Sequence, residues 1–136
     1  MDLEQAVKHI IDGDAVLFLG AGFSREATNI SGGLMKDASD FSKELCEEMN
    51  VRKETDLGKV ANLYLGSRQS EEYYSRAQKL IAKLQDQFIC APKGYTDSQR
   101  TIVLQDWMRI YTTNYDDIVE RICKDEKKKI IPMTLK

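Results

Sequence analysis

The chain has 136 residues, a formal net charge of −2 and three cysteines, with 42% hydrophobic and 31% charged residues. This length predicts one domain, and the composition is typical of a globular rather than a disordered protein. The net charge gives no reason to expect nucleic-acid binding. The odd number of cysteines, which lie far apart in the sequence, disfavours disulfides or a zinc site. No apolar run approaches the ~20 residues that are needed to span a membrane. We therefore expect a cytoplasmic protein with reduced, buried thiols, no metal, and no nucleic-acid or membrane partner.

The N-terminal part is predicted to contain a helix, a strand and a glycine-rich loop. An apolar stripe at helical spacing predicts a helix over residues 2–12. Residues 15–19 are continuously apolar, as is typical of a central parallel strand that is covered on both faces. Residues 20–33 are rich in glycine and small polar residues, which predicts a loop with a helical turn beginning near Ser24.

The middle of the chain is predicted to be helical. Apolar stripes indicate a helix between Met35 and Met49, a short helix capped by Asp56, and a longer helix that is capped by Ser70 and ends near Phe88. The break at residues 92–94 precedes a fifth predicted helix, over residues 97–105, capped by Asp97.

The C-terminal part is predicted to alternate strand, helix and strand. The expected elements are a strand from Trp107 to Thr113, a helix from Asp116 to Lys127, and a third strand from Lys129 to Leu135. Lys127-Lys128-Lys129 is predicted to be a solvated helix end. Strand–helix–strand units favour a parallel sheet, and a sheet of only three strands would leave its edges open. We therefore expect the chain to be part of a larger domain or to need a partner.

The loop after the first strand reads Gly20-Ala21-Gly22-Phe23-Ser24. Ligands of open α/β sheets bind at the carboxyl ends of the strands. Glycines there let the backbone approach a ligand closely. If a helix begins after Ser24, its N-terminus can hold a phosphate. Arg25 stands where the Rossmann fingerprint has its third glycine, and no Gly-Lys-Ser/Thr of a P-loop follows. The alternative is a tight strand-to-helix turn without a ligand.

The second polar turn, Thr112-Thr113-Asn114-Tyr115-Asp116, directly follows the second predicted strand. The amide of Asn114 can donate and accept hydrogen bonds, which suits a ribose, a carboxamide or an attacking water, and Asp116 can accept from ribose hydroxyls. The alternative is that Asn114 or Asp116 caps the following helix, with Asp117 in its first turn.

Taken together, the two motifs resemble the nicotinamide-dinucleotide site of the sirtuin superfamily. They are most similar to its bacterial branch in anti-phage defence proteins, which has a Gly-Ala-Gly-Phe-Ser loop and a Thr-Thr-Asn-Tyr-Asp turn. The resemblance implies an α/β fold with a Rossmann-like parallel sheet that is incomplete in this chain. It makes residues 1–136 the N-terminal portion of one sirtuin-like NAD-binding domain, with residues 34–105 as a helical insertion between the motifs.

The resemblance also implies the roles of individual residues. Asn114 would be the catalytic asparagine near the nicotinamide ribose, and Asp116 the acidic residue that supports it. Thr113 stands where protein-deacylating sirtuins have glutamine, and their zinc-binding cysteine pairs are missing. The only histidine, His9, lies far upstream, whereas the family's catalytic histidine follows the asparagine turn. The residues expected to bind the dinucleotide are Gly20, Ala21, Gly22, Phe23, Ser24, Thr113, Asn114 and Asp116.

The leading hypothesis is an NAD⁺ glycohydrolase that cleaves NAD⁺ to nicotinamide and ADP-ribose in anti-phage defence. NAD⁺ would be its substrate, and a homo-oligomer or a completing partner or domain is expected. Without the histidine, the isolated chain is expected to be inactive. The alternative is a non-catalytic module that binds NAD⁺ or ADP-ribose or serves in assembly, and a protein deacylase is the third candidate.

Overall fold

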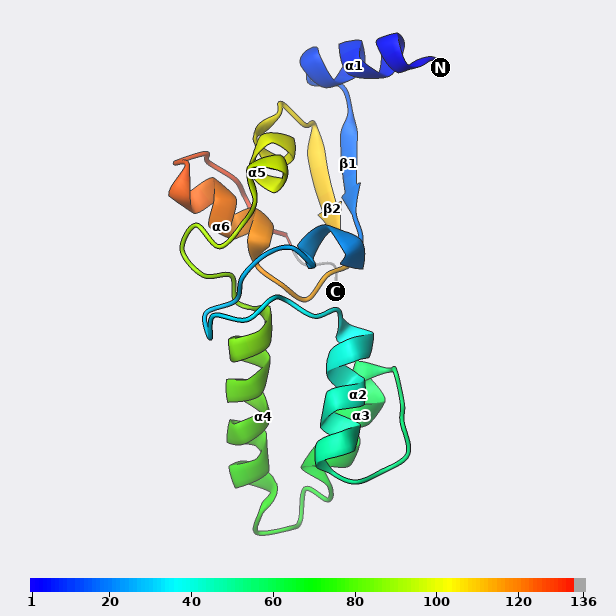
Figure 1. The fold of residues 1–136 in the computed structure, drawn as a ribbon, viewed down its shortest axis with the longest axis vertical. Coiled ribbons are helices and arrows are strands. Elements are labelled where there is room, and N and C mark those ends of the chain that lie inside the picture. Colours follow the sequence, from blue (N-terminus) through cyan, green and yellow to red (C-terminus); the bar gives the residue numbers. More distant parts are fainter. Residues whose placement is uncertain (134–136) are drawn as a thin grey trace.

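The computed structural model describes residues 1–133, and in these residues six α-helices and one 3-10 helix accompany a two-stranded sheet (Figure 1). Strand β1 (Val16–Leu19) pairs in parallel with β2 (Arg109–Thr112). Val16 lies opposite Arg109, and Leu19 lies opposite Thr112. Because both strands run in the same direction, the two motifs that follow them leave the sheet at the same edge. The prediction of an α/β protein with parallel strands is therefore confirmed.

The third strand predicted from Lys129 to Leu135 is wrong for the residues that the structure describes. Residues 129–133 form no strand, and residues 134 and 135 lie outside the described part. The segment begins at Lys128, whose backbone N–H donates to Cys123 O and whose side chain is bound to the end of another helix. Pro132 lacks the N–H that a sheet ladder needs, which also disfavours a strand there.

One face of the sheet is covered and the other is open in the described part of the chain. Helices α5 (Asp97–Leu104) and α6 (Ile118–Asp125) pack on the covered face (Figure 1). On the opposite face, Phe18 is 77% exposed and stacks on Tyr111 with ring centroids 5.1 Å apart. The prediction that β1 is covered on both faces is therefore wrong within residues 1–133.

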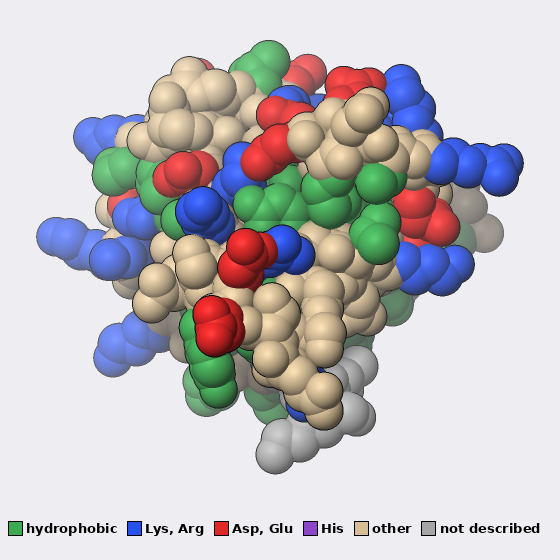
Figure 2. All heavy atoms as spheres, turned by 90° about the horizontal axis from the view of Figure 1, so that it is seen from below, with side chains coloured by type: hydrophobic (Ala, Val, Ile, Leu, Met, Phe, Trp, Pro, Cys, Tyr) green, Lys and Arg blue, Asp and Glu red, His purple; other side chains and the backbone are tan. Residues whose placement is uncertain are grey.

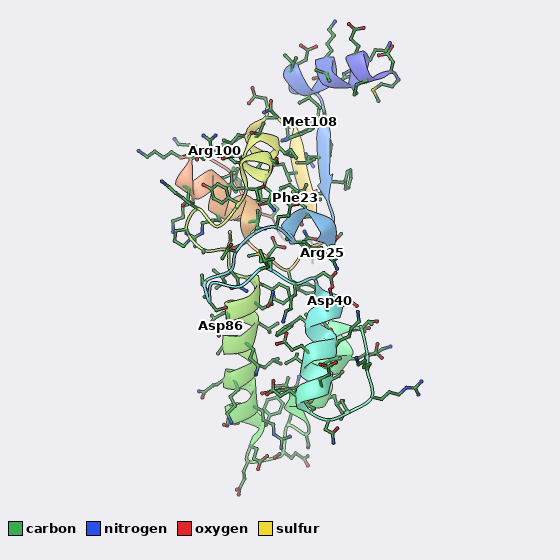
Figure 3. All side chains as sticks on the ribbon, viewed as in Figure 1. Phe23, Arg25, Asp40, Asp86, Arg100 and Met108 are labelled. Atoms are coloured by element: carbon green, nitrogen blue, oxygen red, sulfur yellow. The ribbon has the colours of Figure 1, made fainter. Side chains whose placement is uncertain are left out.

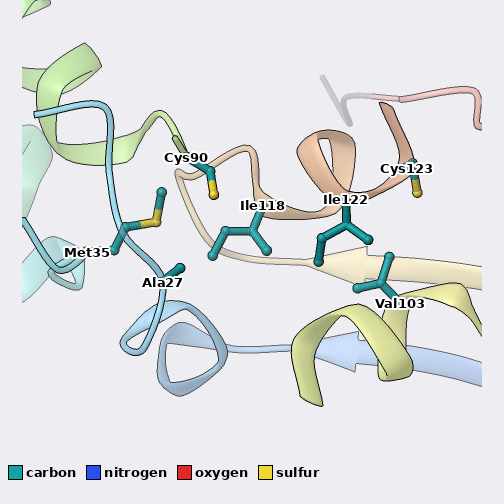
Figure 4. Packing of buried hydrophobic residues seen from close by; sticks show 7 residues of the cluster. All are labelled: Ala27, Met35, Cys90, Val103, Ile118, Ile122 and Cys123. Carbon is teal, nitrogen blue, oxygen red and sulfur yellow. The ribbon is translucent and has the colours of Figure 1, made fainter. Parts of the chain in front are cut away.

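A first hydrophobic cluster joins the sheet, α5 and α6 to the loop after β1 (Figure 4). The spacing of Ile118 and Ile122 places both on one face of α6, and both are fully buried. The predicted cap of α5 is wrong by one residue, because Thr96 accepts from Gln99 N and the Gln99 side chain accepts from Thr96 N in a capping box. The buried members of this cluster are Ala27, Met35, Cys90, Val103, Ile118, Ile122 and Cys123.

A second hydrophobic cluster holds three helices together in the lower half of Figure 1. These helices are α2 (Ala38–Glu48), α3 (Leu57–Leu65) and α4 (Tyr73–Phe88). Figure 2 looks onto this end of the molecule, where acidic and basic side chains are interspersed around a group of hydrophobic ones. The insertion over residues 34–105 stays a prediction, but α5 packs with α6 rather than with these three helices. The buried members are Phe41, Leu45, Cys46, Leu57, Val60, Leu80 and Phe88.

The helix caps in this part follow the predictions only partly. Asp56 caps α3 by accepting from Lys59 N, as predicted. Helix α4 begins at Tyr73 rather than after Ser70, and its N-cap residue, Glu72, makes no capping hydrogen bond with its side chain. Ser70 instead belongs to the preceding turn, where its hydroxyl accepts from Glu72 N.

Helix α1 (Leu3–Ile11) lies at the amino end of β1, at the end of the sheet opposite to the two motifs (Figure 1). Asp2 and Gln5 form a capping box at its start, but none of its residues is buried. No helix within residues 1–133 is long and apolar enough to cross a membrane.

Candidate functional site

A short 3-10 helix, η1 (Ala21–Ser24), follows β1 directly and contains most of the glycine motif. The predicted helical turn is present, but it ends at Ser24 instead of beginning there, and Arg25 is its C-cap. The first residue of the next helix is Ala38. No helix therefore begins directly after Ser24 to hold a phosphate, and only the loop backbone is available for that purpose.

Ser24 connects the two motifs through hydrogen bonds. Its side chain is buried, with 4% of the residue exposed. The Ser24 hydroxyl donates to Asp116 Oδ2 at 2.6 Å and accepts from Asn114 Nδ2 at 3.0 Å. Asn114 Nδ2 also donates to the backbone oxygen of Gly20 at 3.0 Å. Three polar side chains from two motifs about ninety residues apart thus form one connected network, called here the Ser24–Asn114–Asp116 cluster.

The backbone after β2 holds Asn114 and Asp116 in place. Thr113 N donates to Leu19 O at 3.3 Å, which continues the pairing of the two strands by one residue. Asn114 N donates to Thr112 Oγ1 at 3.0 Å, and Ile118 N donates to Asp116 Oδ1 at 3.3 Å. One carboxylate oxygen of Asp116 therefore serves the start of α6 and the other serves Ser24.

The alternative that this turn only caps α6 accounts for the hydrogen bond from Ile118 N to Asp116, but not for the contacts of Asn114. The N-cap residue of α6 is Asp117, which makes no capping hydrogen bond with its side chain. Its carboxylate accepts instead from Cys90 N at 2.6 Å and ties α6 to the end of α4. Asn114 takes no part in capping and points its amide at the glycine motif.

The remaining predicted site residues lie at the surface around this cluster. Gly20, Ala21, Gly22 and Thr113 are exposed, and Phe23 is half-buried against the first hydrophobic cluster. A Cβ atom built on Gly20 or Gly22 meets no heavy atom within 4 Å, and neither glycine has a positive φ. The described part of the fold therefore does not itself require glycine at these two positions.

None of the salt bridges in the described residues involves Asp116. Arg25, which directly follows Ser24 in the sequence, binds Asp37 Oδ2 at 2.6 Å and Asp40 Oδ2 at 3.1 Å. A hydrogen bond from Asp40 N and then the Arg25 guanidinium lower the pKa of the Asp37 carboxyl. This salt bridge joins the glycine motif to the start of α2, as Figure 3 shows for Arg25 and Asp40.

Two residues that support the site were not predicted from the sequence. Gln99 donates through Nε2 to Phe23 O and so holds η1 against α5. A Cβ atom on Gly94 would lie 2.5 Å from Thr28 O, so only glycine fits where this loop crosses the segment after η1. The Thr-x-x-Gln spacing of the capping box was a readable signal for Gln99, whereas nothing local distinguishes Gly94 from an ordinary turn glycine.

The structure does not bring His9 to the cluster, because α1 lies at the opposite end of β1 and His9 is exposed there. Within residues 1–133 no group of three or more His, Cys, Asp or Glu side chains could hold a metal ion. A cavity of about 790 Å³ is lined by Arg25 but by no residue of the Ser24–Asn114–Asp116 cluster.

Comparison with known proteins gave no match. No protein-family model matches the chain, and no curated protein or solved structure matches it significantly. An assignment of function therefore rests on the two motifs and on the geometry that brings them together.

Proposed function

We propose that this chain binds NAD⁺ at the carboxyl edge of β1 and β2, as part of a sirtuin-like NAD⁺ glycohydrolase with a Rossmann-like sheet. The observation that supports the proposal is the direct hydrogen bonding of Ser24 to both Asn114 and Asp116. Two motifs that serve only as separate turns have no reason to share a buried hydroxyl. Their meeting point lies where open parallel sheets bind ligands.

The two exposed glycines are a second support for ligand binding at this edge. Ala could replace Gly20 or Gly22 without a clash in the described part, since no heavy atom lies within 4 Å of either Cβ position. Glycine at such positions is explained if a ligand approaches the backbone closely, as a pyrophosphate does in dinucleotide sites. The phosphates of NAD⁺ would then lie against η1, with the nicotinamide ribose toward Asn114.

The cluster has the charges that cleavage of NAD⁺ requires. Breaking the bond between ribose C1′ and the nicotinamide nitrogen leaves the electron pair on nicotinamide and positive charge on the ribose. The carboxylate of Asp116, without a cationic partner in the described residues, would stabilise that charge, and Asn114 would orient the ribose or the attacking water. The water's proton must go to a general base as its oxygen bonds to C1′.

The non-catalytic alternative is supported by the position of the only histidine. His9 lies on α1 at the opposite end of β1 and cannot act as the general base at this site. We therefore expect the 136-residue chain to bind NAD⁺ without turnover. Protein deacylation is the least supported of the three candidates, because Thr113 replaces the glutamine that the resemblance associates with that reaction.

Calorimetric titration with NAD⁺ and mass spectrometry of the products test the proposal together. Gly22→Val is expected to abolish binding while circular dichroism stays unchanged, because the added side chain blocks the ligand and its Cβ meets no heavy atom within 4 Å in the described fold. Asn114→Ala should also weaken binding, and Asn62→Ala, on the exposed side of α3, is the matched control.

The outcomes distinguish a glycohydrolase from a module that binds NAD⁺ without cleaving it. Binding without release of nicotinamide supports the non-catalytic alternative for this chain, and release of nicotinamide and ADP-ribose supports a glycohydrolase. If the wild-type chain does not bind NAD⁺, or if Gly22→Val binds it with unchanged affinity, the proposal is overturned.

A further inference from the structure

A cavity with a volume of about 790 Å³ lies between the segment after η1 and the upper ends of α2 and α4. It is called here the loop–helix cleft, and its walls include Asn29, Met35, Phe41, Asp86 and Gln87. In Figure 3, Arg25 and Asp40 lie at the upper end of α2, and Asp86 lies at the upper end of α4. Its size is that of a small-molecule site, and it shares no residue with the Ser24–Asn114–Asp116 cluster.

The cleft wall contains two buried residues with amide side chains, and one of them has a buried N–H group without a protein acceptor. Gln87 is only 8% exposed, and its Nε2 is buried without a hydrogen-bond partner in residues 1–133. Asn29 is 3% exposed, and its Oδ1 accepts from Gly33 N at 3.0 Å and from Ser31 Oγ at 2.9 Å. Unlike Gln87 Nε2, Asn29 Nδ2 is not among the fully buried unpaired atoms of the described residues. Buried polar atoms are normally paired, and an unpaired donor costs about 1–3 kcal/mol.

The charges around the cleft disfavour an ionic ligand. The three cationic side chains that line it are already engaged, with Arg25 bound to Asp37 and Asp40, Lys36 bound to Glu44 at 2.5 Å, and Lys83 bound to Glu48 at 2.8 Å. The charged residues that line it are otherwise the carboxylates of Asp40, Glu44 and Asp86, so the two signs balance. A neutral ligand that offers acceptors to the amide N–H groups fits this wall better than an anion does.

The apolar part of the wall favours a flat ligand. Met35 and Phe41 are buried beneath the cleft, while Leu34 is 64% exposed and free to cover a bound ring. Asn and Gln side chains pair well with purine rings, whose ring nitrogens accept hydrogen bonds from amide N–H groups. Rotation about the last side-chain bond of Gln87, a soft torsion, turns Nε2 toward such an acceptor.

We propose that the loop–helix cleft is a second binding site that takes an uncharged purine nucleoside through the amides of Asn29 and Gln87. A ligand there would join the segment after η1 to α2 and α4, and so to the second hydrophobic cluster. This site goes beyond the proposed function, because no residue of the Ser24–Asn114–Asp116 cluster lines it.

Calorimetric titration with adenosine tests the cleft. Gln87→Leu keeps the approximate size of the side chain and removes the unpaired donor, so it should weaken adenosine binding about tenfold or more, which is a change of at least 1.4 kcal/mol. The same variant should be at least as stable as the wild type in urea denaturation, because a buried unpaired group has been removed. Gln85→Leu, on the exposed side of the same helix, is the matched control.

A second variant, Asn29→Asp, tests adenosine binding in the cleft independently of Gln87→Leu. Asn29→Asp keeps the oxygen that accepts from Gly33 N and Ser31 Oγ and replaces only Nδ2, so it should also weaken adenosine binding. Absence of adenosine binding at millimolar concentration, or equal affinity in the wild type, Gln87→Leu and Asn29→Asp, overturns the proposal. Adenosine binding that is lost in Gly22→Val but kept in Gln87→Leu would place the nucleoside at the glycine motif and would equally overturn a site in the cleft.

Discussion

Ser24 shows how one hydroxyl can organise a site without facing the ligand. Ser24 was expected to bind the dinucleotide, but its hydroxyl is buried and donates to Asp116. A serine hydroxyl has one donor and two acceptor positions, so it can hold a carboxylate and an amide at the same time. Ser24 is therefore a positioning residue for Asn114 and Asp116.

We predict that Ser24→Ala lowers the free energy of unfolding by about 1.5–3 kcal/mol, the range for a hydrogen bond to a charged group. In a double-mutant cycle with Asp116→Ala, the two changes should not add, because each removes the same interaction. Urea denaturation measures both quantities, and Ser75→Ala, on the exposed side of α4, should change stability by less than about 0.5 kcal/mol. Strictly additive effects would contradict the hydrogen bond.

Cys90 makes the stability of the fold depend on alkaline pH. Burial, and then the charge of Asp117, raise the pKa of its thiol from 9.0 to about 11. Between pH 9.0 and about pH 11 the native thiol keeps a proton that the unfolded chain has lost, so the free energy of unfolding falls as the pH rises. The pKa values of Cys123 and Tyr95 are also raised, chiefly by burial, and act in the same direction.

We predict that Cys90→Ala reduces the loss of stability between about pH 9 and about pH 11 without abolishing it. Urea denaturation across this range measures the slope for the wild type and the variant. Cys123→Ala provides the comparison, because burial raises the pKa of that thiol as well. An unchanged slope in Cys90→Ala would show that the Cys90 thiol does not keep its proton in the native state.

At the scale of elements, hydrophobic periodicity located the helices and strands well, and the caps were located less well. Both strands and all six helices lie within or close to their predicted ranges. The wrong cap at Asp97 stands beside Thr96, which can also cap, so local chemistry left more than one solution there. At Ser70 the helix begins two residues later than expected, with Glu72 as an N-cap that makes no capping hydrogen bond. The structure chose Thr96 because Gln99 completes a capping box and also reaches Phe23 O.

The basic run at residues 127–129 was expected to be a solvated helix end, and the structure corrects this for Lys128. Its ammonium group donates to the backbone oxygens of Val103, Leu104 and Gln105, at 3.4, 3.2 and 2.7 Å. These oxygens lie at the C-terminal end of α5, where the helix has unpaired acceptors and a partial negative charge.

We predict that Lys128→Met lowers the free energy of unfolding by about 0.5–2 kcal/mol, since the methionine keeps the apolar stem but offers no donor to the end of α5. Thermal or urea denaturation measures the change. Lys129→Met, at an exposed neighbouring position, is the control and should have little effect. Equal effects of the two substitutions would show that only net charge matters here.

At the scale of the whole molecule, the chain has two hydrophobic clusters and one open sheet face. Phe88 and Tyr115, with ring centroids 5.9 Å apart, connect the helical part to the second motif, and Asp117 binds Cys90 N beside them. Val16, Phe18 and Tyr111 remain exposed on the face of the sheet opposite α5 and α6. This is the surface on which the prediction of a homo-oligomer or a completing partner can be tested.

We predict that the unfolding midpoint of the wild-type chain rises with protein concentration, as expected when association buries surface in the native state only. Phe18→Thr should remove this dependence, because it removes the largest apolar group of the open face. Tyr74→Thr, at an equally exposed position on α4, should leave it unchanged. A midpoint independent of concentration in the wild type would contradict self-association through this face.

Sequence alone determined the α/β class, the positions of both strands and the polar segments that follow them. These properties are local, because hydrophobic periodicity and turn residues act over a few neighbouring positions. The sequence also identified candidate site residues at the strand ends, including Asn114 and Asp116.

Only the tertiary structure decided what those residues do to one another. The pairing of β1 with β2 brings Ser24 within hydrogen-bonding distance of Asn114 and Asp116, and this depends on the register of strands about ninety residues apart. The same holds for Lys128 at the end of α5 and for the unpaired amide of Gln87 in the loop–helix cleft. Such contacts form when distant segments pack, and no local pattern in the chain encodes their geometry.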